Sequence, residues 1–152
     1  MKKALVPFIL LLAVSVLALF IPAVPTTIVT EGINSGDVAW MLAATALVLL
    51  MTPGLAYFYG GMIDTKNIIS TMLQSFIAMG VISVLWIVVG FSLAFGESKG
   101  GFIGDPTTFF MFNHVLDGKP WSLAPTIPLV LFAFFQLKFA IITPALITGT
   151  FA

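Results

Sequence analysis

The chain alternates between long stretches without charge and short polar segments. Residues 38–63 contain no charged side chain, and residues 67–96 are again uncharged. A third apolar stretch runs from about residue 126 to residue 152 and contains one charge, Lys138. Each stretch is at least as long as the ~20 residues that a helix needs to cross a bilayer. The pattern therefore predicts three transmembrane helices, at about 38–63, 67–96 and 126–152.

The first 23 residues form a separate hydrophobic segment. Two lysines precede residues 4–20, in which Ser15 is the one polar residue, and Ala23 closes a passable cleavage site. A basic start followed by an apolar core is typical of a secretory signal peptide. The core is slightly long, so an uncleaved signal anchor is the alternative for residues 1–23. Residues 24–36 then form a linker.

The positive charges at the N-terminus predict the orientation. Lys2 and Lys3 should stay in the cytoplasm, because basic residues favour the cytoplasmic side of a membrane. The helix at 38–63 then runs inward. The polar turn at 64–67 is expected to be cytoplasmic, and the loop at 97–125 external.

Composition supports a membrane location. Hydrophobic residues make up 60% of the 152 residues and charged residues only 8%, with a mean hydropathy of +1.16. A soluble domain carries roughly 25% charged residues. We therefore expect an all-α integral membrane protein that crosses the cell membrane several times, with the lipid bilayer as its surroundings. The formal net charge of zero gives no reason to expect nucleic acid as a partner.

The sequence gives little support for a catalytic site, a cofactor site or a metal site. Cysteine is absent, and no nucleophile–base set, glycine-rich phosphate loop or HExxH pattern is present. His114 and Asp117 have a spacing that could offer two metal ligands, but two side chains in a polar loop do not make a metal site. We expect no enzyme activity, no cofactor and no metal.

Polar and aromatic side chains gather in the third stretch. Phe132, Phe135 and Phe139 recur on one face of a helix, and Gln136 lies close to that face. Such a stripe is more often packing than a binding site, although π-faces beside an amide could attract a small cation. Lys138 is about 100° round the helix and would repel a cation, so we expect a structural role for it, with backbone carbonyls or a carboxylate as partner.

Proline and glycine in the first predicted helix indicate close packing. Pro53 removes an intrahelical hydrogen bond, and Gly54, Gly60 and Gly61 would let a neighbouring helix approach. We expect structural roles for these four residues.

Three blocks of sequence resemble one known family. Residues 51–61 read Met-Thr-Pro-Gly-Leu-Ala-Tyr-Phe-Tyr-Gly-Gly, and residues 90–96 read Gly-Phe-Ser-Leu-Ala-Phe-Gly. Residues 135–144 read Phe-Gln-Leu-Lys-Phe-Ala-Ile-Ile-Thr-Pro. In this order, within residues 37–152, the blocks resemble the first three helices of the ammonium transporter family (Amt, with its Mep and Rhesus relatives).

The resemblance implies a channel-type transporter that moves ammonium, or ammonia after deprotonation, through each subunit of a homotrimer. By the family pattern Phe139 corresponds to the phenylalanine that gates the pore on the external side, and Gln136 to the glutamine beside it. Lys138 occupies a variable position of the motif. The resemblance also implies regulation of the full-length protein by a PII-type signal protein.

The resemblance covers only the start of the family fold, which has eleven helices in two inverted halves. The second gating phenylalanine, the tryptophan and serine of the recruitment site and the paired pore histidines would lie beyond Ala152. We therefore expect an N-terminal part of an ammonium transporter that does not conduct alone. The alternative is a small non-conducting membrane interaction subunit that keeps the packing surfaces of the family.

Overall fold

A computed structural model describes residue 16 and residues 32–148 of the chain. Apart from residue 16, the expected signal peptide or anchor at 1–23 lies outside the described residues. The same is true of residues 24–31 of the expected linker.

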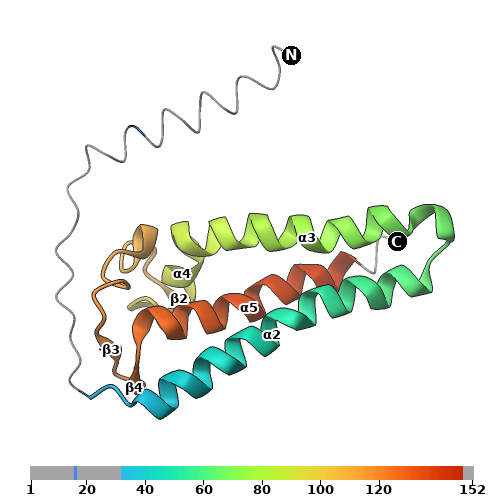
Figure 1. Cartoon of the computed structure of the whole chain (residues 1–152). Coiled ribbons are helices and arrows are strands. Elements are labelled where there is room, and N and C mark those ends of the chain that lie inside the picture. The colour runs from blue at the N-terminus through green and yellow to red at the C-terminus, as the bar shows by residue number, and fades with distance from the viewer. Residues whose placement is uncertain (1–15, 17–31, 149–152) are drawn as a thin grey trace.

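The described chain is a bundle of three long helical segments (Figure 1). Helices α2 and α5 start at the same end of the bundle, and α3 runs in the opposite direction. Each segment contacts both others. The first segment is α2 (Ser35–Met62). The second is α3 (Ile68–Leu85), which continues through a π-helical turn at Trp86–Gly90 into α4 (Phe91–Phe95). The third is α5 (Leu129–Thr148).

All three segments are long and apolar enough to cross a membrane. In the described part of the chain the candidate spans are Ser35–Met62, Thr65–Phe95 and Leu129–Ile147. This confirms the prediction of a multi-pass helical membrane protein. Helix α2 begins three residues before the expected position because the Asn34 side chain caps it. The side-chain oxygen of Asn34 accepts hydrogen bonds from the backbone N–H groups of Gly36, at 2.8 Å, and Asp37, at 3.2 Å.

The loop between α4 and α5 contains short strands, so the all-α prediction holds for the membrane part but not for this loop. Strand β1 (Ser98–Lys99) pairs antiparallel with β2 (Ile103–Gly104), and β3 (Pro120–Trp121) pairs antiparallel with β4 (Ala124–Pro128). A single 3₁₀ turn at Phe110–Phe112 lies between the two hairpins.

Strand β4 also changes the start of the last helix, which begins at Leu129 rather than near residue 126. The reason is local. Pro125 and Pro128 disfavour helical backbone at the residues before them, so the chain stays extended until Leu129. The backbone N–H of Asn34 donates to the carbonyl of Thr126 at 2.9 Å, which ties the start of α2 to this strand.

An aromatic core packs the loop against the ends of the helices. Phe91 is fully buried and contacts the rings of Trp86, Phe95, Phe109 and Phe112 at centroid distances of 5.2–5.8 Å. Trp86 also donates a hydrogen bond of 3.1 Å from its indole N–H to the backbone carbonyl of Ala133. These contacts join α3, α4 and the start of α5 to the loop through one shared core.

Away from the loop, the helices meet through small side chains. The buried residues of α2 are Thr52, Ala56 and Gly60, and those of α3 are Thr71 and Ser75. Small residues at the contact let helix backbones approach closely, which is how helices pack in a membrane. The large apolar side chains of both helices mostly point outward, where lipid or further helices can cover them.

Candidate functional site

Helix α5 has a buried stripe made of residues four apart. Ala133, Leu137, Ile141 and Ala145 are each at most 3% exposed. A four-residue spacing keeps side chains on one side of a helix, so this stripe is the side of α5 that packs into the bundle. Apolar residues occupy the other sides as well, and for that reason the sequence did not reveal which side faces inward.

The opposite side of α5 carries an aromatic pair. The rings of Phe135 and Phe139 lie 5.2 Å apart at an angle of 71°, an edge-to-face contact, and Phe139 is 43% exposed. Gln136 is half-buried and lies about 60° round the helix from Phe139. The exposed π-face and the amide therefore border the same side of the helix, which is open in the described part of the chain.

The third phenylalanine of the predicted stripe is used elsewhere. Phe132 packs against Phe95 at 5.1 Å and against Trp121 at 4.8 Å, within the aromatic core under the loop. The structure thus brings Phe135 and Phe139 together and separates Phe132 from them.

Lys138 lies on a third side of α5, about 100° from both Leu137 and Phe139. The side chain is half-buried, and within the described residues it has no hydrogen-bond or ion-pair partner. The carbonyl or carboxylate partner expected from the sequence is thus not found in this part of the chain.

The residues singled out in α2 differ in their surroundings. A Cβ atom at Gly60 would lie 3.0 Å from Cγ of Met72, so α2 and α3 approach closely there. A Cβ atom at Gly54 or Gly61 would meet no described atom within 4 Å. Pro53 lies inside α2, which stays helical from Ser35 to Met62. Of the three glycines, Gly60 alone makes a close helix contact within the described residues.

The loop end of the bundle contains an open cavity of about 630 Å³. Aromatic rings and ionisable groups share its lining, namely Phe95, Phe109, Trp121, Glu97, Asp105 and His114. The sequence pattern gives no sign of this cavity, because residues from four separate parts of the loop and from α4 form it. Carboxylates beside π-faces could attract cations to this end of the molecule.

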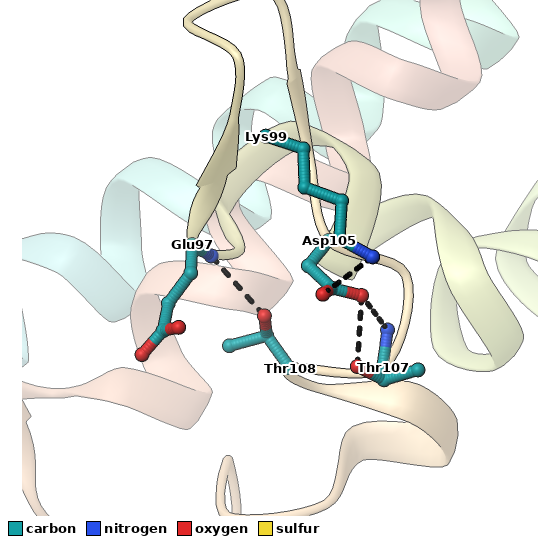
Figure 2. Close-up of polar contacts among 5 residues, drawn as sticks. All are labelled: Glu97, Lys99, Asp105, Thr107 and Thr108. Carbon is teal, nitrogen blue, oxygen red and sulfur yellow. Dashed lines mark hydrogen bonds and ion pairs between the residues drawn. The ribbon is translucent and has the colours of Figure 1, made fainter.

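The carboxylate of Asp105 is bonded to other residues of the loop and is not free to bind a ligand. Figure 2 shows its carboxylate between the ammonium group of Lys99, at 2.8 Å, and the backbone N–H and hydroxyl of Thr107, at 2.9 and 2.8 Å. These interactions, the Lys99 contact first, lower the pKa of Asp105 to about 2. Beside it, the hydroxyl of Thr108 accepts a hydrogen bond from the backbone N–H of Glu97 at 3.1 Å (Figure 2). The Asp-Pro-Thr sequence was the available signal, since aspartate before proline favours a turn.

His114 and Asp117, the two candidate metal ligands, are close but isolated. Nδ1 of His114 lies 3.4 Å from a carboxylate oxygen of Asp117. Among the described residues, no group of three or more His, Cys, Asp or Glu side chains could hold a metal ion. The pair closes a tight stretch of loop in which Met111, Phe112 and His114 have positive φ angles of 55–61°.

Comparison with known proteins gives one consistent result. Residues 39–152 match the profile of the Ammonium Transporter Family. The ammonium transporter of Mycobacterium tuberculosis (strain ATCC 25618 / H37Rv) is 43% identical over 132 residues, and that of Aquifex aeolicus (strain VF5) is 47% identical over 123 residues. Each alignment covers 78% of this chain and 28% of the relative.

Solved structures agree with the sequence matches. The crystal structure of Saccharomyces cerevisiae Mep2 superposes with a TM-score of 0.68 at 34% identity, over 78% of this chain and 26% of Mep2. A Mep2 mutant from Candida albicans gives a TM-score of 0.60 at 27% identity, over 77% of this chain and 28% of that protein. The chain thus spans little more than a quarter of the length of the proteins that it matches.

Proposed function

Because the chain belongs to the ammonium transporter family, we propose that it forms part of a path by which ammonium, or ammonia after deprotonation, crosses the cell membrane. The observation that carries this proposal is the family match over residues 39–152, which covers most of the first membrane helix and all of the other two. Ammonium resembles potassium in size, so selecting it favours π-faces and hydrogen-bond acceptors followed by a narrow apolar passage.

In this proposal the open side of α5 lines the path. Phe139 presents an exposed ring, Phe135 supports that ring from one turn before, and Gln136 supplies an amide oxygen beside it. The buried stripe on the other side of α5 holds the helix against α2 and α3. Gly60 supports the α2–α3 contact, and we assign structural roles to Pro53, Gly54, Gly61 and Lys138 as well.

The described helices supply one wall of the path. The aromatic pair lies opposite the buried stripe of α5, and Phe139 is 43% exposed, so in this proposal the other walls come from helices other than α2 and α3. We further propose that the full-length protein is a homotrimer, that a PII-type protein regulates it, and that the 152-residue chain alone does not conduct.

A second candidate function is a non-conducting membrane subunit that binds other helices. The observation in its favour is the outward-facing apolar surface of α2 and α3, where Leu47 is 64% exposed and Ile69 is 81% exposed. Such a surface suits helix association as well as lipid. A transport assay distinguishes the two functions.

The decisive experiment is a chimera. In the Mycobacterium tuberculosis ammonium transporter, the segment aligned with this chain is replaced by residues 39–152, and uptake of radiolabelled methylammonium is measured in cells that lack their own ammonium transporters. We expect saturable uptake comparable with that of the parent transporter. A chimera that reaches the membrane in normal amount but takes up no methylammonium would contradict the proposed function and favour the second candidate.

The isolated chain tests the single-wall proposal separately. Reconstituted into liposomes, the 152-residue protein should give no saturable methylammonium uptake above empty vesicles. Saturable uptake by the isolated chain would show that these helices enclose a path on their own, which would overturn the single-wall proposal while leaving the transport function in place.

A further inference from the structure

Lys138 is the tenth of the twenty residues of α5, at the middle of a membrane span. With a rise of 1.5 Å per residue, its Cα lies roughly 13 Å from the start of the helix and roughly 15 Å from its end. The four-carbon stem of a lysine is much shorter than either distance, so the ammonium group cannot reach water beyond either end of the helix. It must be satisfied at the depth where it lies.

The surroundings of Lys138 on α5 are apolar. Phe134 and Ile142 lie one turn before and one turn after it, and these three residues form a single row, the Lys138 ridge. Pro144 leaves the carbonyl of Ala140 without its intrahelical donor, but Ala140 is about 160° round the helix from Lys138. The helix itself therefore offers no acceptor on this side.

Among the residues that the structure describes, no carboxylate lies at the right depth. The six acidic residues are Glu31, Asp37, Asp64, Glu97, Asp105 and Asp117. Asp37 is in the first turn of α2, Asp64 lies beyond its other end, and Glu31 precedes α2 in the sequence. The remaining three are in the loop between α4 and α5. The described residues of a second copy have the same distribution, so they offer Lys138 no carboxylate at this depth either.

We propose that the Lys138 ridge is a docking surface for a different membrane helix, one that carries an Asp or Glu at mid-bilayer depth. Charge complementarity favours this occupant over a plain apolar helix or lipid, because an unpaired ammonium in hydrocarbon is strongly unfavourable and a carboxylate neutralises it. The two relatives named above are matched over 28% of their length, so most of the length of such a protein is left to supply a partner helix. The row of Phe134, Lys138 and Ile142 gives the ridge that a partner helix needs for packing.

The proposal can be tested with the 152-residue chain in liposomes at neutral pH. The chain lacks cysteine, so Thr65→Cys in the exposed turn after α2 provides one site for a fluorescent donor. The probe is an acceptor-labelled polyleucine transmembrane peptide of about twenty residues with a single central Asp. Matched peptides carry Asn or Leu at that position, and binding is measured by energy transfer.

We expect the Asp peptide to bind at least tenfold more tightly than the Leu peptide. Lys138→Met should abolish this preference, and Lys138→Arg should retain it. Lys99→Met, in the loop, should leave it unchanged, and circular dichroism checks that each variant is folded. Equal binding of the Asp and Leu peptides, an undiminished preference in Lys138→Met, or equal binding of the Asp and Asn peptides would overturn the proposal. The assay does not measure transport, so its outcome is independent of the proposed function.

Discussion

Replacing Phe139 by alanine tests the role of α5 most directly, because the same helix contains a matched control. Phe139 is 43% exposed and has one edge-to-face ring contact, with Phe135 at 5.2 Å. Phe134 is 39% exposed and likewise has one edge-to-face contact, with Phe112 at 6.1 Å. The two phenylalanines lie about 140° apart round the helix. The two rings are similarly exposed, but Phe139 lies on the side proposed to line the path and Phe134 lies on the Lys138 ridge.

The expected effect on stability is similar for both substitutions. Replacing a fully buried phenylalanine by alanine costs about 3–5 kcal/mol, so a side chain that is a little more than half buried should cost roughly 2–3 kcal/mol. The expected effect on transport differs. If the Phe139 ring stabilises a passing cation by about 1 kcal/mol, Phe139→Ala should lower the rate of uptake roughly fivefold, whereas Phe134→Ala should leave it near the parent value.

The assay uses the chimera that contains residues 39–152. Methylammonium uptake is divided by the amount of chimera in the membrane, and the unfolding midpoint of each purified variant is recorded. Two results would refute the reasoning: unchanged uptake in Phe139→Ala, or an equal loss of uptake in both variants at equal stability. The second result would mean that uptake reports the packing of α5 rather than a ring facing the path.

Two further predictions concern the packing of the helices and the loop. Gly60→Val should lower the unfolding midpoint of the 152-residue chain in detergent, because its Cβ would lie 3.0 Å from Cγ of Met72 and crowding of this kind costs about 1–3 kcal/mol. Gly61→Val, whose Cβ would meet no described atom within 4 Å, should shift the midpoint less. Equal shifts would contradict the close contact at Gly60. Lys99→Met should raise the pKa of Asp105 from about 2 toward its ordinary value of 3.8, as measured by NMR of the labelled carboxyl carbon, whereas an unchanged pKa would remove Lys99 as the main cause. Because the folded pKa is the lower one, the pairing stabilises the loop above pH 3.8 and is lost as the pH falls through about 2.

The membrane part of the fold could be predicted because one physical rule determines it. Uncharged stretches longer than a bilayer is thick have to form helices, since backbone groups in lipid must bond within their own segment. The loop between α4 and α5 follows no such rule. Its short strands depend on pairings such as Ser98 with Gly104 and Trp121 with Ala124, and strands of two residues carry no recognisable alternation.

The sequence proposes candidate residues on α5 but does not show how they are arranged. The spacing of the three phenylalanines placed them on one face of α5, yet Phe132 is taken up by the core beneath the loop. The spacing of residues along a helix specifies the direction of each side chain, but not which other residues it will contact. Phe132 packs against Phe95 and Trp121, and Trp121 reaches it through a hairpin that the sequence did not reveal.

The middle of α5 places an apolar, a charged and an aromatic residue next to one another. Leu137, Lys138 and Phe139 are each turned about 100° from the one before, so they point in three directions. Leu137 is 3% exposed and holds α5 in the bundle, while Phe139 is open on another side. Lys138 occupies the remaining side, where an apolar residue would pack equally well against lipid and a charge would not. A lysine at this depth is therefore explained only if that side meets an acceptor, and the same geometry keeps its charge away from the ring that faces the proposed path.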